Sequence, residues 1–284
     1  MVGTGISKGE RLAAQIRAPE PDFALPEPLT QTQVIAWDPD AIDLVACVWR
    51  ILDDSPSTET GCRYANLASL APPLLGCSDL FRSIKFRSAL QKRVAECGQL
   101  ESAYDTLIRS IVAPHILHTL DSGERIRLSN VSPSTSGAYS FPLRYQCPPS
   151  LRIHPSGSPL FTRPHRDLEY GHQPGEVNLW LPLTDTKHPP DAATLHVETR
   201  VTEDGDHADY APVRLAVGQM LMFHGVVRHH RVFPNATAGT RVSLDFRVAP
   251  SKCFDNGWRI PGLKIVHGMK EFCFEWRESE AVSG

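Results

Sequence analysis

The sequence contains no apolar stretch close to the ~20 residues that span a bilayer. Its first ten residues lack the charged and then apolar pattern of a signal peptide. Basic residues are not in excess, because 29 Lys and Arg stand against 32 Asp and Glu. A broad nucleic-acid surface needs such an excess to neutralise phosphates. We therefore expect a cytoplasmic protein that has neither a membrane nor a nucleic acid as its partner.

Cysteine is scarce: there are seven, an odd number, and no Cys-x-x-Cys pair occurs. This usage argues against a disulfide framework or a zinc ribbon and favours a reducing compartment. The Gly-rich phosphate loop that ends in Lys and Ser or Thr is also absent. The sequence therefore does not predict a P-loop nucleotidase.

The 284 residues divide by pattern into four stretches. Prolines crowd residues 1–30, which we expect to form a flexible arm. Residues 31–284 are predicted to form a single domain, with a helical layer over 31–125, a strand-rich core over 126–250 and a C-terminal extension over 251–284. Helices followed by strands predict an α+β, mainly β, architecture.

Helix signals concentrate in the first half of the chain. Asp38 is predicted to cap a helix whose apolar face runs to Leu52, and Ser78 is predicted to begin a second helix. A third helix is expected over 100–120, where Pro114 marks a kink or a boundary.

After residue 126 the apolar residues recur with a period of two. The segments predicted as strands are 127–131, 139–145, 151–154, 176–183, 194–199, 213–217, 220–224 and 241–248. Short strands at this density, separated by Pro and Gly, favour a β-sandwich or barrel with the helices packed outside the sheet.

Histidine is concentrated in the strand-rich half, where nine of the 12 lie between His154 and His230. Neutral imidazole is the commonest side-chain metal ligand, so this excess indicates a metal site. His165 and Asp167 form the sharpest pair, because residues two apart on an extended backbone share a face. His229 and His230 are the candidates for a distant third ligand.

Segment 240–248 alternates cleanly and places Arg241, Ser243, Asp245 and Arg247 on one face. This face is either the solvated side of an edge strand or the inner wall of a barrel. In the second case, the guanidinium of Arg241 and the hydroxyl of Ser243 suit the carboxylate of a keto-diacid.

Taken together, these motifs resemble those of the iron(II)/2-oxoglutarate-dependent dioxygenases. The shared pattern is His165-x-Asp167, then His230, then Arg241-x-Ser243, and the resemblance covers roughly residues 143–250. More narrowly, the chain is similar to the StrG-like branch of streptomycin biosynthesis, near the phytanoyl-hydroxylase-like enzymes.

The resemblance implies a double-stranded β-helix, a cupin-like jelly-roll barrel over 126–250 with flanking N-terminal helices. It implies that His165, Asp167 and His230 are the metal ligands and form the catalytic centre. It makes Arg241 and Ser243 the binding residues for 2-oxoglutarate. The interval of 241 − 230 = 11 residues selects His230 as the distal ligand.

The activity implied is that of an oxidoreductase that uses Fe(II), 2-oxoglutarate as co-substrate and O₂. It would hydroxylate, or otherwise oxidise, a C–H bond of a small polar metabolite in natural-product biosynthesis. We expect the chain to act as a monomer or a homodimer on this small-molecule substrate.

Further residues are candidates for pocket contacts. Asn178 is predicted to contact 2-oxoglutarate, and the candidates for the substrate are Arg152, His154, Trp180, His196 and Arg228. A purely structural role stays open for three of these residues: barrel packing for His196, core packing for Trp180 and a surface charge for Arg228.

Two other classes of function stay open at this point. A cupin-type metal enzyme, an oxidase or an isomerase, would keep the three ligands but would not use 2-oxoglutarate. A non-catalytic β-barrel binding protein would show no iron-dependent turnover. Release of succinate coupled to consumption of 2-oxoglutarate distinguishes the proposed dioxygenase from both.

Overall fold

The structure is a computed structural model that describes residues 23–53, 84–131, 137–159, 161–187, 194–203, 205–237, 239–259 and 268–277. Most of the predicted N-terminal arm, through residue 22, lies outside these residues, as does the predicted helix start at Ser78. Within the described part, no helix is long and apolar enough to cross a membrane.

The helices lie mainly in the first half of the chain, as predicted. They are α2 (Glu27–Thr30), α3 (Leu44–Asp53), α5 (Ile84–Glu96), α6 (Gly98–Leu107), a π-helical turn (Ile108–Val112), α7 (Ala113–Thr119) and α8 (Ser122–Leu128). The boundary expected at Pro114 is present, because the π-helical turn ends and α7 begins one residue earlier. A proline in the first turn of a helix costs no backbone hydrogen bond.

The strands form two antiparallel sheets, so the predicted mainly β architecture is confirmed. The large sheet contains β1 (Gln33–Ala36), β2 (Asn130–Val131), β3 (Tyr139–Gln146), β4 (Ser150–His154), β6 (Val177–Pro182), β9 (Gln219–Phe223), β11 (Arg241–Pro250) and β12 (Met269–Trp276). The small sheet contains β5 (Thr162–His165), β7 (Leu195–Glu198), β8 (Tyr210–Pro212) and β10 (His230–Val232).

From β4 to β11 the chain passes repeatedly between the two sheets. In the large sheet β4 and β6 flank β11, and β9 lies beside β6. In the small sheet the order is β5-β10-β7-β8. Strands that are distant in sequence therefore lie side by side, and this brings residues near 165 next to residues near 230.

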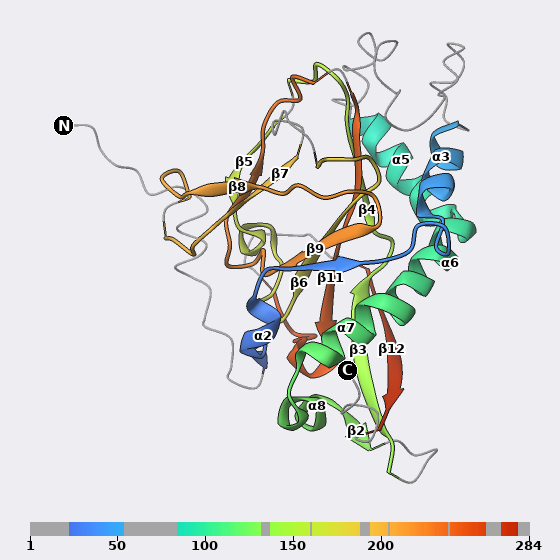
Figure 1. Cartoon of the computed structure of the whole chain (residues 1–284), viewed down its shortest axis with the longest axis vertical. Helices are drawn as coiled ribbons and strands as arrows, with labels where there is room; N and C mark the ends of the chain where they lie inside the picture. The colour runs from blue at the N-terminus through green and yellow to red at the C-terminus, as the bar shows by residue number, and fades with distance from the viewer. Residues whose placement is uncertain are drawn as a thin grey trace, which may run out of the picture.

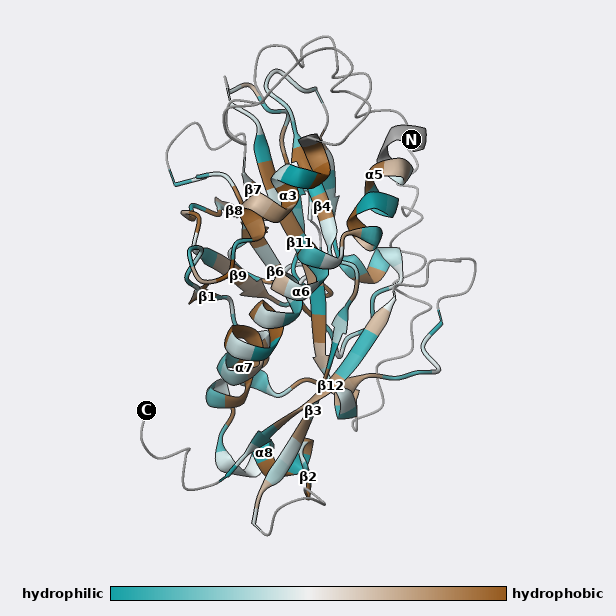
Figure 2. Cartoon of the chain, turned by 90° about the vertical axis from the view of Figure 1, so that its right-hand side faces the viewer, coloured by the Kyte–Doolittle hydropathy of each residue, from teal (hydrophilic) through white to brown (hydrophobic). Residues whose placement is uncertain are grey.

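The two faces of the large sheet pack against different layers. Figure 1 shows α3, α5 and α6 on one side of this sheet and β5, β7 and β8 toward the other. Figure 2 shows α3, α6 and α7 in front of the strands, with apolar positions among their polar ones. The helix-side core takes Val242, Leu244, Phe246 and Val248 from β11, so the alternation predicted for this strand is present. A smaller apolar cluster lies between the sheets and contains Trp180, Leu195, Val197, Val213, Leu215, Leu221 and Phe223.

Tyr104 connects the helices to the sheet. Its ring packs edge-on against Phe246 and Tyr145, with centroid distances of 5.0 and 5.9 Å. Its hydroxyl donates to the carbonyl oxygen of Gln146 at 2.8 Å, so this buried polar group is satisfied. The helical layer therefore fixes the strand that carries Arg241 on its opposite face.

Several local predictions are wrong. Asp38 does not cap the helix: its side chain accepts from the backbone of Asp40 in a turn, and Asp43 accepts from the backbone N–H of Ala46 instead. Segment 127–131 is not one strand, because α8 extends through Leu128 and only Asn130 and Val131 form β2. Asp121 caps α8 by accepting from the N–H of Glu124.

Strand positions also differ from the prediction in the second half of the chain. Residues 213–216 are not in a strand, and β8 precedes them. The predicted C-terminal extension contains β12, which pairs with β3 along its whole length. Strand β1, which pairs with β9, was not predicted.

We predict that Leu107→Ala lowers the free energy of unfolding by about 2–5 kcal/mol, because Leu107 is fully buried in the helix-side core. Chemical denaturation followed by circular dichroism measures this change. Val131→Ala is the control, since Val131 is 78% exposed and its truncation should change stability by at most about 0.5 kcal/mol. Equal losses in the two variants would contradict this assignment of the core.

Candidate metal centre

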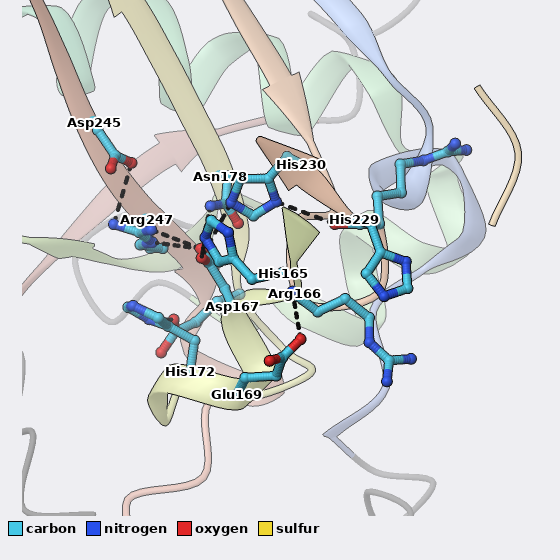
Figure 3. A network of polar contacts seen from close by, with 12 residues as sticks. His165, Arg166, Asp167, Glu169, His172, Asn178, His229, His230, Asp245 and Arg247 are labelled. Atoms are coloured by element: carbon cyan, nitrogen blue, oxygen red, sulfur yellow. Dashed lines mark hydrogen bonds and ion pairs between the residues drawn. The ribbon is translucent and has the colours of Figure 1, made fainter. Parts of the chain in front are cut away.

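Three side chains predicted as metal ligands meet at the edge of the small sheet. His165 ends β5, Asp167 begins a 3-10 helix and His230 begins β10. The pairing of β10 with β5 places His230 directly opposite His165. One ligand atom from each of the three lies within 4.8 Å of the other two, and all three residues are buried. Figure 3 shows the three side chains turned toward one another.

The two imidazoles are oriented by their own backbone. Nδ1 of His165 lies 2.9 Å from the carbonyl oxygen of Arg163, and Nδ1 of His230 lies 3.1 Å from that of Arg228. A carbonyl oxygen can only accept, so Nδ1 of each ring carries the proton and donates it. The Nε2 atoms face the centre, and they lie 3.8 and 3.3 Å from Oδ1 of Asp167. This is the tautomer that a metal-binding histidine needs.

The local chain around Asp167 is held by a tight turn. The N–H of Asp167 donates to the carbonyl oxygen of Gly225 at 2.8 Å, and the N–H of Arg166 donates to the carboxylate of Glu169 at 2.9 Å (Figure 3). The 3-10 helix ends at Gly171, whose φ of +100° favours glycine. The backbone at Arg166 and Asp167 is therefore held by the turn at Gly225 and by the 3-10 helix itself.

Oδ2 of Asp167, the second carboxylate oxygen, accepts from two neighbours. Arg247 donates through Nη2 at 2.6 Å and through Nε at 3.1 Å. Nδ2 of Asn178 donates to the same oxygen. Asp245 in turn pairs with Nη1 of Arg247 at 3.1 Å, and Figure 3 shows this sequence of contacts.

Burial and the neighbouring charges shift the pKa of each of the three residues. Burial, followed by the neighbouring His230, lowers the pKa of His165 to about 4. Burial alone would raise the pKa of Asp167, but Arg247 and His230 hold it well below its usual range. Burial likewise opposes the charged form of His230, but Asp167 outweighs it and raises the pKa of His230. The centre thus offers an ionised carboxylate beside a neutral imidazole.

Arg241 and Ser243 lie on the same face of β11 as Asp245 and Arg247. Arg241 is 7% exposed and Ser243 is fully buried. Nε and Nη1 of Arg241 and Oγ of Ser243 have no hydrogen-bond partner within the described chain. Burial, and then the charge of Arg152, lowers the pKa of Arg241 to about 10, so the guanidinium remains cationic at neutral pH. An unpartnered buried cation beside an unpartnered hydroxyl fits an anionic group.

The other predicted pocket residues divide into two sets. Asn178, Trp180 and His154 lie near the centre or near Arg241: Asn178 contacts Asp167, the ring of Trp180 lies 6.0 Å from the guanidinium of Arg241, and His154 stands opposite Arg241 in the β4–β11 pairing.

The structure does not bring the remaining three to the metal ligands. Arg152 is largely exposed and pairs with Asp245 at 3.1 Å. His196 stands opposite Arg231, one position from the residue facing His230, so its side chain lies on the other face of the small sheet. Nη1 of Arg228 donates weakly to the carbonyl oxygen of Glu198 at 3.4 Å.

The role of Glu198 was not predicted from the sequence. This carboxylate, 2% exposed, accepts from the N–H of His229 at 2.8 Å and from its Nδ1 at 3.2 Å. It also accepts from the backbone N–H and the hydroxyl of Thr202. His229 therefore pairs with Glu198, away from Asp167, and the pair fixes the chain just before His230. Glu198 and His229 are 31 positions apart in the sequence, so no local spacing pattern could have indicated their contact.

Part of the chain is similar in sequence to one curated protein. No family model matches the chain. The streptomycin biosynthesis protein StrG of Streptomyces griseus is 34% identical over 107 residues, which are 38% of this chain and 47% of StrG. The match thus spans about half the length of this relative. It confirms the StrG-like resemblance predicted from the motifs.

Solved structures show a weaker likeness. The non-heme monooxygenase ThoJ, as its nickel complex, has a TM-score of 0.47 at 16% identity over 80% of this chain and 77% of its own. The non-heme alpha-ketoglutarate-dependent carbocyclase SnoK from nogalamycin biosynthesis has a TM-score of 0.31 at 16% identity over 38% of this chain and 50% of its own.

We predict that Glu198→Ala lowers the free energy of unfolding by about 1–3 kcal/mol, because the buried N–H of His229 loses its acceptor. Glu203→Ala is the matched control, since Glu203 is exposed on the following loop and should change stability by at most about 0.5 kcal/mol. Urea denaturation of both variants measures the difference. No loss in Glu198→Ala would mean that this carboxylate does not support the loop.

Proposed function

We propose that the chain is a non-haem iron(II)- and 2-oxoglutarate-dependent oxygenase acting on a small polar metabolite. The observation that carries this proposal is the convergence of His165, Asp167 and His230. It is supported by Nε and Nη1 of Arg241 and Oγ of Ser243, which lack hydrogen-bond partners among the described residues. Both residues lie on β11, whose Arg247 contacts Asp167. A three-ligand cluster and a buried arginine each occur in many classes of protein, whereas their combination matches the needs of a metal-chelating keto-diacid.

The donor set supports iron. Two imidazoles and one carboxylate on one side of an ion, with positions left open, are typical of non-haem Fe(II) oxygenases. His165 and His230 direct their Nε2 atoms toward the centre, and Asp167 presents Oδ1. The ionised Asp167 and the neutral His165 are already in the protonation states that a divalent metal needs.

The anchor for 2-oxoglutarate would be Arg241 with Ser243. A guanidinium can hold the distal carboxylate through two N–H donors, and the hydroxyl adds a third. In the described part of the chain, Nε and Nη1 of Arg241 and Oγ of Ser243 lack hydrogen-bond partners. The cost of burying them unsatisfied is removed when the dicarboxylate binds.

Iron with 2-oxoglutarate and O₂ would supply an oxidant able to remove hydrogen from a substrate C–H bond, most often giving hydroxylation. The protein's own contribution is orientation and exclusion of water. The apolar cluster between the sheets includes Phe223, whose ring packs edge-on against His230 at 5.3 Å. This wall keeps bulk water from one side of the centre.

We also infer that the two sheets form a double-stranded β-helix within a single domain. Strands β4 to β11 supply four neighbours in each sheet, β4-β11-β6-β9 and β5-β10-β7-β8, and this order supports a jelly roll with two Greek keys. The core shared by the helices and the large sheet supports one folding unit.

The proposed substrate class follows from the similarity to StrG, a streptomycin biosynthesis protein. It points to a small polar intermediate of natural-product biosynthesis. His154 and Trp180 are the better-placed candidates for substrate or co-substrate contacts, because both lie close to Arg241.

Metal binding is the first test. Titration of the metal-free chain with Fe(II) under anaerobic conditions should show one site per chain, and the variant His230→Ala should weaken binding by at least about tenfold, because one of three ligands is lost. His196→Ala is the matched control, since His196 lies on the opposite face of the small sheet. Equal binding by the wild type and His230→Ala would contradict the assigned centre.

Dependence on 2-oxoglutarate is the second test. Anaerobic addition of 2-oxoglutarate to the Fe(II)-bound chain should produce a weak visible charge-transfer absorption. Arg241→Met should weaken 2-oxoglutarate binding by about 10- to 100-fold, because the distal carboxylate loses a charged hydrogen-bonding partner. Arg144→Met, which breaks a pair with Glu271 elsewhere on the large sheet, is the control.

The outcome also separates the alternative functions. With a substrate present, the oxygenase releases succinate as 2-oxoglutarate is consumed. Iron binding without the absorption would favour an oxidase or isomerase that does not use 2-oxoglutarate. Absence of iron binding would favour a non-catalytic binding protein.

A further inference from the structure

We infer that Arg247 and Asn178 are positioning residues that hold Asp167 so that only its Oδ1 is offered to the metal, and that Asp245 fixes Arg247 for this task. This inference rests on the proposed metal centre. It concerns how the carboxylate is presented and goes beyond the identity of the ligands.

The two carboxylate oxygens of Asp167 have different partners. Oδ2 accepts Nη2 of Arg247 at 2.6 Å, Nε of Arg247 at 3.1 Å and Nδ2 of Asn178. Oδ1 faces Nε2 of His230 at 3.3 Å and Nε2 of His165 at 3.8 Å. Three N–H donors saturate Oδ2, whereas Oδ1 points to the two metal-binding nitrogens.

Neighbouring strands supply the two donors. Arg247 on β11 stands opposite Asn178 on β6 in the antiparallel pairing, so their side chains leave the sheet on the same face. Gly225 permits this arrangement, because a Cβ at that position would lie 2.7 Å from the side chain of Asn178. The donors are therefore set by sheet register rather than by a loop.

Asp245 holds the arginine from its other side. Its Oδ1 lies 3.1 Å from Nη1 of Arg247, and its Oδ2 lies 3.1 Å from Nη2 of Arg152. The charges alternate from the exposed Arg152 through Asp245 and Arg247 to the buried Asp167. An arginine with one face fixed by Asp245 cannot rotate away from Asp167 without leaving a buried charge unpaired.

The consequence is a carboxylate that binds through one oxygen. If Oδ2 were free, the same carboxylate could bind the ion through both oxygens and occupy a position that the co-substrate or O₂ needs. Partners that orient a metal ligand typically change metal affinity by about 10- to 100-fold when they are mutated. The arrangement therefore affects both the affinity and the coordination of the metal.

The experiment compares the full-length wild type with Arg247→Lys, Asp245→Asn and the control Arg144→Lys, using Co(II) alone as the probe. Calorimetry gives the dissociation constant, and the visible absorption of bound Co(II) reports its coordination. The melting temperature without metal reports folding. Lysine keeps the charge but cannot reproduce the planar fork of the arginine. Arg144 makes an ion pair of similar length, at 2.7 Å to Glu271, which is more exposed and lies outside the metal centre.

We expect Arg247→Lys to weaken Co(II) binding by about 10- to 100-fold and to change the shape or intensity of the absorption, whereas Arg144→Lys changes neither. Asp245→Asn removes the charge that fixes Arg247 but leaves the Arg247–Asp167 pair in place. We therefore expect Co(II) affinity to fall by about tenfold, the low end of this range. This variant carries the test if Arg247→Lys does not fold.

Unchanged affinity and unchanged absorption in the folded variants overturn the positioning role while leaving the proposed function intact. A wild-type chain that binds no Co(II) overturns the proposed metal centre and this inference with it. The two failures are therefore distinguishable in one series of titrations.

Discussion

The site depends on one constraint: an ionised carboxylate, that of Asp167, lies 2% exposed between two sheets. Such a charge is stable in the interior only if cations and N–H donors surround it. Arg247 and Asn178 compensate one of its oxygens, and the two histidines face the other. The same arrangement that makes the buried charge tolerable also aims it at the point where the imidazoles converge.

A single strand carries most of this chemistry. One face of β11 packs Val242, Leu244, Phe246 and Val248 against the helices. On the other face, Nε and Nη1 of Arg241 and Oγ of Ser243 have no hydrogen-bond partner among the described residues, whereas Asp245 and Arg247 are paired. On this face of β11, the paired Asp245 and Arg247 therefore have a structural role, and Arg241 and Ser243 are suited to binding a ligand. The helical layer, joined through Tyr104, keeps this strand in place.

Periodicity predicted most strands of the core, because half-buried strands alternate whatever their partners are. It failed where local hydrogen bonding competes with pattern. Asp121 caps α8, so the apolar residues that follow it are helical. Asp38 closes a turn and leaves the capping of α3 to Asp43. Strands β1, β5, β10 and β12 were missed, since each is fixed by pairing with a strand that is distant in sequence.

The sequence by itself determined the residue types and intervals of the candidate site: the pair His165 and Asp167, the distal His230, and the alternation beginning at Arg241. These follow from short-range spacing on extended backbone. Only the tertiary structure decided which candidates meet. It directed His229 to Glu198, turned His196 to the opposite face of its sheet and set Arg247 on Asp167. The physical reason is strand register, because pairing between distant segments fixes which face each side chain occupies, and no local pattern encodes it.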